Sequence, residues 1–301
     1  MKAALFDLNG NKAKMIELPE QFNEEFRPDI IMRSFLAAQS ASRQPYGSYI
    51  RAGQRYSVDI SKRRRDFKTS YGHGISRAPR KTLWRRGTQF GWVGAFSPHT
   101  VGGRRAHPPR AYKILEREIN KKEKKKALRS AIAATIVPEI VKQRGHLFTE
   151  LPSIVEKRIE EIAKTKDFKQ IMIKLKLQDE LERSSVSKVR PGRGKMRGRR
   201  YKTKKGPLVV VGGECPLLKA ANNVPGVDVV TVNNLRIHLV APGGVPGRLT
   251  LFSENAIDKM RNDRLFTDLQ RKETKEEEHS AEKPKVVKII KQIPPKPKRN
   301  E

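Results

Sequence analysis

Arginines and lysines interleaved with aromatic rings are the residues of this sequence with the clearest capacity for chemistry. Residues 45–110 hold 15 basic and two acidic residues, with nine glycines and nine of the chain's 19 aromatic residues. A guanidinium can hold a phosphate through two hydrogen bonds, and an aromatic ring can stack on an unpaired base. The combination predicts a segment that threads into folded RNA rather than a free basic tail. Its candidate RNA-binding residues are Arg51, Arg55, Lys62, Arg63, Arg64, Arg65, Tyr71, His73, Arg77, Arg80, Lys81, Trp84, Arg85, Arg86, Trp92, Arg104, Arg105, His107 and Arg110.

A second basic segment, residues 188–206, contains ten basic residues and no acidic one. In isolation such a run resembles a nuclear-localisation patch. It lies inside the chain and directly before a predicted core strand, so we expect it to clamp the backbone of the same RNA. Its candidate RNA-binding residues are Arg190, Arg193, Lys195, Arg197, Arg199, Arg200, Tyr201 and Lys202.

Motifs for enzymatic chemistry are missing from the sequence. Val209–Gly213 offers a strand followed by two glycines, but neither the third glycine of a dinucleotide fingerprint nor a phosphate-binding P-loop follows. The six histidines never show metal-ligand spacing, and the single Cys215 is better suited to packing than to nucleophilic attack. Asp59 and Asp66 are the only acids in 45–110, so a carboxylate pair is not expected there. We therefore predict no catalytic residue, no metal and no cofactor.

The net charge of +33 is concentrated in the two basic segments, which hold 23 of the surplus charges. Like charges at this density oppose compaction, so they require an anionic partner. No apolar run is long enough to cross a membrane, no secretory signal opens the chain, and one cysteine allows no internal disulfide. These features predict a soluble intracellular protein whose partner is a nucleic acid and not a membrane.

The helices and strands expected outside the two basic segments follow an α/β pattern. Short apolar segments, rich in β-branched residues, alternate with stretches that could form helices. This order predicts a single globular domain with a mainly parallel sheet flanked by helices. We assign it to residues 1–264, interrupted by 45–110 as a long non-globular extension and crossed by 188–206; a disordered Lys/Pro-rich tail, 265–301, follows. The expected strands are a hairpin over 1–18 turning tightly at Asn9-Gly10, then 208–211, 227–232 and 249–252. The expected helices are four turns from Pro28 to about 43, then 114–145 with a kink or end at Pro138, then about 153–164 and 167–178, and a last helix to about 261 with Ser253 as N-cap.

Several motifs, taken in order, resemble the L-four family of universal large-subunit ribosomal proteins in its archaeal and eukaryotic form. They cover residues 1–264 and comprise Tyr71–Gly74 with Arg77 and Pro79, Val101–Pro109, Ala127–Thr135, Arg144–His146, Arg197–Tyr201 and Leu239–Thr250. The resemblance implies an α/β domain at the outer face of the large subunit and an extension that penetrates the ribosomal RNA. It also implies that the far end of the extension lines a constriction of the nascent-peptide exit tunnel, beside the loop of the L-twenty-two family protein. That end is expected within Gly72–Gly94, with Gly72, Gly74, Arg77, Trp84, Gly87 and Gly91 nearest the tunnel.

The sequence is compatible with three functions. The first is a non-enzymatic structural protein of the large ribosomal subunit in the cytoplasm, which contacts large-subunit rRNA, neighbouring ribosomal proteins and the nascent peptide in transit, with no homo-oligomer. The second is an RNA- or nucleotide-modifying enzyme on a Rossmann-like domain, which would need a cofactor loop after Val211. The third is a DNA-compacting protein, which the interleaved aromatics disfavour because duplex DNA offers no unstacked bases.

Overall fold

A six-stranded sheet in the order β2-β1-β5-β10-β8-β9 forms the centre of the fold in a computed structural model, which describes residues 1–58, 60–87 and 89–267. All neighbouring strands pair in parallel except β2, which pairs antiparallel to β1 at the edge. This confirms the predicted fold class. The strands are β1 (Lys2–Phe6), β2 (Lys12–Glu17), β5 (Ile154–Val155), β8 (Leu208–Val211), β9 (Asp228–Thr231) and β10 (Thr250–Ser253).

Both faces of the sheet are covered, because successive side chains of a strand point to opposite sides. In β8, Leu208 and Val210 join one apolar cluster while Val209 and Val211 join another, and all four are fully buried. A strand buried on both faces is typical of a parallel sheet. The strand predictions at 208–211, 227–232 and 249–252 are therefore confirmed.

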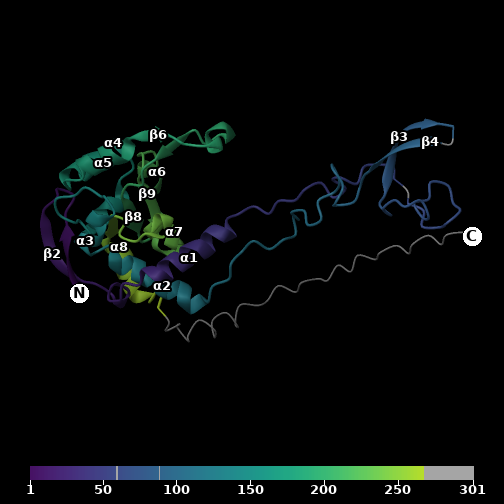
Figure 1. Cartoon of the computed structure of the whole chain (residues 1–301). Helices are drawn as coiled ribbons and strands as arrows, with labels where there is room; N and C mark the ends of the chain where they lie inside the picture. Colours follow the sequence, from purple (N-terminus) through teal and green to yellow (C-terminus); the bar gives the residue numbers. More distant parts are fainter. Residues whose placement is uncertain (59, 88, 268–301) are drawn as a thin grey trace, which may run out of the picture.

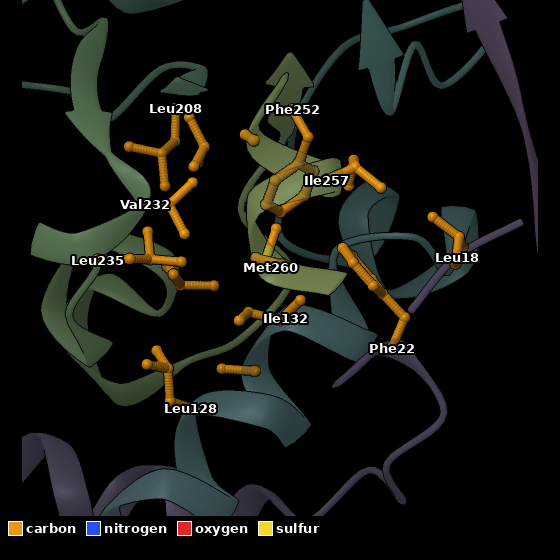
Figure 2. Close-up of a cluster of buried hydrophobic side chains, with 14 of the residues drawn as sticks. Leu18, Phe22, Leu128, Ile132, Leu208, Val232, Leu235, Phe252, Ile257 and Met260 are labelled. Atoms are coloured by element: carbon orange, nitrogen blue, oxygen red, sulfur yellow. The ribbon is translucent and has the colours of Figure 1, made fainter. Parts of the chain in front are cut away.

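The first cluster lies under one layer of helices and contains the edge-to-face pair Phe22–Phe252, with ring centroids 5.3 Å apart (Figure 2). Its helices are α1 (Pro28–Ala41), α2 (Lys121–Ala134), α7 (Ile237–Val240) and α8 (Glu254–Asn262), with the 3-10 turns η1 (Glu20–Phe22) and η4 (Val232–Asn234). The second cluster lies on the other face and includes residues of α3 (Pro138–Gln143), α4 (Thr165–Lys174), α6 (Leu217–Asn222) and the 3-10 turn η2 (Lys157–Glu161), and Leu181 of α5 (Gln178–Ser185) packs against it.

Helices α1 and α2 lie side by side and antiparallel, and they anchor the extension. The backbone N–H of Arg27 donates to Ser130 Oγ at 2.8 Å, and the N–H of Arg117 donates to Ser40 Oγ at 2.9 Å. The first bond joins the start of α1 to the later part of α2, and the second joins the end of α1 to the segment before α2. Both arms of the extension therefore leave the domain from the same end of this helix pair (Figure 1).

The extension is two long arms that end in a hairpin far from the sheet (Figure 1). The two arms contact each other, since Ser48 N–H donates to Pro109 O at 3.1 Å and a Cβ at Gly53 would meet backbone atoms of Arg104. The far hairpin pairs β3 (Arg80–Arg86) with β4 (Gln89–Gly94). No described residue of 45–110 belongs to either apolar cluster of the domain.

Four local predictions need correction or extension. The first hairpin forms, but only Gly10 has a positive φ (+85°), so the tight two-residue turn at Asn9-Gly10 is wrong: a type I turn from Asp7 to Gly10 ends in a left-handed glycine. The predicted helix at 153–164 is wrong, because Ile154–Val155 pair with β1 and β10 as a buried strand before η2. The stretch 114–120 is not helical. Of the predicted kink or end at Pro138, the structure has the end: α2 stops at Ala134 and Pro138 begins the separate helix α3. The helix α5 and the hairpins of the two basic segments were not predicted.

Other expectations are confirmed. Pro28 is the first residue of α1, and the Ser253 side chain accepts a hydrogen bond from Ala256 N–H at 3.1 Å as the N-cap of α8. Most of the predicted tail lies outside the described residues, which end at 267. No helix in the described part of the chain is long and apolar enough to span a bilayer.

The separation of the extension from both clusters generates a stability prediction. Replacing residues 62–92 with a short Gly-Ser linker removes no side chain from either cluster, so the melting temperature should stay within about 3 °C of the wild-type value. Thermal unfolding followed by far-ultraviolet circular dichroism measures it. An unfolded α/β domain in the deletion variant would contradict the assignment of 45–110 as an appendage.

Candidate nucleic-acid interface

Several cations of the globular domain are paired with carboxylates, whereas none of the described cations of the extension is. Arg129 Nε lies 2.6 Å from Glu24 Oε2, and Lys14 Nζ lies 2.7 Å from Glu254 Oε1. Among the described residues, no lysine or arginine of 45–110 forms an ion pair. The positive charge of the extension is thus left for an external anion to neutralise.

The basic run 62–65 is displayed on the outside of a folded turn. Ser61 Oγ donates to Asp66 Oδ2 at 2.5 Å, and the Asp66 carboxylate also accepts the Phe67 N–H at 2.8 Å. These hydrogen bonds lower the pKa of Asp66, so this carboxyl stays ionised and keeps the turn closed. Thr69 is buried and its Oγ1 donates to Arg63 O. All four side chains of the run are exposed, so the turn holds its backbone while its cations face outward.

Cations of the extension lie over aromatic rings rather than beside carboxylates. Tyr71 carries two guanidinium groups, Arg77 at 4.6 Å and Arg64 at 5.2 Å from the ring centroid. Lys81 Nζ lies 4.2 Å from the ring centroid of Tyr56. Such contacts hold a charge in place without neutralising it, which leaves both ring and cation able to meet RNA.

Three aromatic rings gather into a small cluster at the far end of the extension, with Phe67 still 64% exposed. The rings of Phe67 and Phe90 meet edge to face at 5.6 Å, and Trp92 lies 5.8 Å from Phe90. Ser70 and Ala95 are buried nearby. Trp84 stays 56% exposed, with its ring over Gly91 of the facing strand. Strands β3 and β4 were not predicted, because charged residues and glycines interrupt the alternation of apolar and polar residues that marks a strand.

The second basic segment is also a hairpin. Strands β6 (Ser187–Val189) and β7 (Tyr201–Thr203) flank a 3-10 turn, η3 (Arg193–Arg197). Its basic side chains are exposed except Arg190, which is partly buried and whose Nε donates to Arg199 O at 2.9 Å. Arg190, predicted as an RNA-binding residue, thus holds the hairpin together.

Buried charges fix the base of this second hairpin. Glu180 is fully buried; its carboxylate accepts two hydrogen bonds from Arg183, at 2.6 and 2.7 Å, and lies 2.6 Å from Nδ1 of His146. Arg183 Nη2 also donates to Lys205 O at 2.7 Å, just after β7. Arg248, equally buried, donates to Gly206 O at 2.8 Å and pairs with Asp228 at 2.6 Å. These roles could not be predicted from local sequence, because most of the hydrogen-bond partners are 20 or more residues away along the chain.

The structure places the predicted site residues in two groups. The basic hairpin 187–203 carries eight of them, and the extension carries the rest. Within the extension, Gly72, Gly74 and Arg77 precede β3, Trp84 lies in β3, Gly87 follows it and Gly91 lies in β4. The returning arm carries Arg104, Arg105, His107 and Arg110.

The carboxyl edge of the sheet, where a Rossmann-like enzyme would hold its ligand, is filled by the chain itself. The Glu160 carboxylate accepts hydrogen bonds from Gly212 N–H at 2.8 Å, Ser253 Oγ at 2.5 Å and Asn255 Nδ2 at 3.0 Å. These donors come from the ends of β8 and β10, where a bound phosphate would need them. No group of three His, Cys, Asp or Glu side chains among the described residues could hold a metal.

Most of the chain is similar to known proteins of one family. Residues 16–263 match the family described as ribosomal protein L4/L1. The chain belongs to the ribosomal protein L4/L1 family.

Its relatives include archaeal proteins called large ribosomal subunit protein uL4. That of Nanoarchaeum equitans is 47% identical over 267 residues, which cover 88% of this chain and all of the relative. That of Methanocaldococcus jannaschii is 49% identical over 265 residues, covering 87% of this chain and 98% of the relative. Membership of the L4/L1 family confirms the resemblance drawn from the motifs. It identifies a ribosomal protein that is structural and not an enzyme, so the enzyme alternative is set aside.

The Glu180 network generates a pH prediction. Burial raises the pKa of this carboxyl, but hydrogen bonds from Arg183 and His146 outweigh burial and lower it from 4.5 to about 2. A depressed folded-state pKa stabilises the fold above the unfolded value and loses that contribution as pH falls through the folded value. Glu180→Gln should therefore lower the free energy of unfolding by about 3 kcal/mol above pH ~5, and the deficit should shrink between pH ~4.5 and ~2.

Urea unfolding of both proteins across this pH range measures the deficit. Glu182→Gln, an exposed position on the same helix, is the matched control and should change stability little at any pH. A deficit in Glu180→Gln that does not vary with pH would contradict the proposed ionised state.

Proposed function

We propose that this protein is a structural constituent of the large ribosomal subunit that binds and organises large-subunit rRNA through its extension and its basic hairpin. One observation carries the proposal: the extension gathers 15 basic residues, and none of them has a carboxylate partner among the described residues, while several cations of the domain do. Polyphosphate is the anion that such a surface fits best.

The two segments divide the work. Exposed arginines of the run 62–65 and of the hairpin 187–203 hold phosphates, and exposed rings such as Trp84 and Tyr201 stack on unpaired bases. The α1–α2 pair and the buried Glu180 and Arg248 contacts hold the roots of both segments. The extension also serves assembly, so the 62–92 deletion that leaves the domain folded should block formation of the large subunit.

We further propose that the far end of the extension lines part of the nascent-peptide exit tunnel, beside the L-twenty-two family protein. The far hairpin is the part of the extension most distant from the sheet, which supports this placement (Figure 1). Its outer residues, including Arg85, Arg86 and Trp84, are exposed and available to a passing peptide.

RNA binding should depend steeply on salt. The affinity of the protein for large-subunit rRNA should fall by several log units per tenfold rise in salt, at 0.7–0.9 per neutralised phosphate, roughly. Replacing Arg63, Arg64 and Arg65 with Gln should reduce that slope by about two to three units. Filter binding in about 0.1 to 0.5 M KCl measures it.

A control triple with the same loss of charge separates local contact from net charge. Lys164, Lys166 and Lys169, on or next to α4, are exposed on the other side of the sheet and should leave the slope nearly unchanged when replaced by Gln. Both tryptophans lie in the extension, so their fluorescence should also change when RNA binds. An affinity independent of salt would contradict the proposal.

The tunnel placement is tested by thiol cross-linking. In a Cys215→Ser background, Arg86→Cys and His73→Cys introduce single thiols at exposed positions of the far end. Ribosomes that carry either variant should cross-link to a stalled nascent chain with one cysteine, and ribosomes with Lys166→Cys on α4 should not. Equal yields from the α4 control, or none from either far-end position, would overturn the placement.

A further inference from the structure

Five lysines open helix α2 and belong to neither basic segment. Residues 121–126 read Lys-Lys-Glu-Lys-Lys-Lys, and the side chains of Lys121, Lys122 and Lys124 are exposed. The charge pattern does not single them out, because acidic residues elsewhere in 111–187 reduce the net positive charge of that stretch to a modest surplus.

Partners within the protein account for only part of this cluster. The single acid, Glu123, lies 3.1 Å from Arg33 Nη1 of α1. Lys126 lies 3.7 Å from Glu24, and Lys125 donates to Thr267 O at 3.1 Å. In the part of the chain that the structure describes, Lys121, Lys122 and Lys124 have no carboxylate within ion-pair distance.

The folding of α2 gives no reason for these three lysines. Residues 127–132 and 134 are buried and pack the helix against α1 and the sheet, so its second half supplies the apolar contacts. Lysines in the first turns of a helix repel each other and the partial positive charge of its amino end. An external anion would remove both penalties.

The position of these lysines in the fold indicates that the anion is the RNA bound by the extension. The second arm of the extension runs directly into α2, and the Arg117–Ser40 hydrogen bond places this junction at the end of α1, where the first arm leaves. The lysines therefore lie at the root of the extension, where RNA that surrounds the arms would meet the domain (Figure 1).

We propose that Lys121, Lys122 and Lys124 form a third phosphate-binding surface, which grips the RNA backbone where the extension enters it. The inference rests on the proposed rRNA binding and adds a site to it. An acidic protein is the weaker candidate, because residues 121–126 include no apolar or aromatic side chain and lysine is depleted from protein–protein interfaces. Long lysine side chains suit a phosphate backbone, which they meet as mobile point charges.

The test is a triple variant, Lys121→Gln, Lys122→Gln and Lys124→Gln, in the full chain. Glutamine forms helix nearly as well as lysine, so α2 should remain folded by circular dichroism. Binding to in vitro transcribed large-subunit rRNA should weaken at least tenfold near 0.15 M KCl, and the salt slope should fall by about two units. A Lys→Arg triple at the same positions should restore both.

The control is the Lys164, Lys166 and Lys169 triple already described, which removes the same charge from the other face. A wild-type slope in the α2 variant, with wild-type protein still binding RNA, would overturn the third surface alone. Unchanged RNA binding with loss of an acidic neighbouring protein from the assembled subunit would also overturn it. Failure of wild-type protein to bind the rRNA would instead refute the proposed function.

Discussion

Repulsion among cations that have no partner within the chain explains why the protein divides into a compact domain and a long extension. The globular domain relieves part of this repulsion internally, because residues such as Arg129 and Arg248 meet carboxylates at 2.6 Å. The extension cannot, since it holds 15 basic residues against two acids. A segment with this charge gains nothing by folding onto an α/β core, so it leaves the domain and its stability comes from a polyanion.

The extension nevertheless retains local order, and the reason lies in its aromatic rings. The ring faces of Tyr71 and Tyr56 hold nearby cations in position without neutralising their charge. Phe67, Phe90 and Trp92 form a partly exposed aromatic cluster at the far hairpin. Preformed shape at the far end lowers the entropy lost on binding, so more of the electrostatic attraction is available for affinity. The α1–α2 pair then ties this end to a folded anchor.

The sequence predicted what local patterns determine. The strand at 208–211, the Pro28 start of α1 and the Ser253 cap all follow from short-range chemistry, and the segmental charge located both basic segments. It missed what long-range pairing decides. The two-residue strand β5 exists only because β1 and β10 flank it, and β3 and β4 pair across a charged, glycine-containing hairpin. The structural role of Arg190 could not be predicted, because its side chain bonds to the backbone carbonyl of Arg199, which the sequence pattern does not place beside it.

The most direct test of the account is arginine reactivity, measured residue by residue. Phenylglyoxal labelling and mass spectrometry would compare the free protein with the protein in intact large subunits. We expect Arg63, Arg64, Arg85 and Arg86 to react in the free protein and to be protected in the subunit, while the fully buried Arg248 reacts in neither. Equal labelling of the extension arginines in both states would contradict the claim that RNA neutralises them.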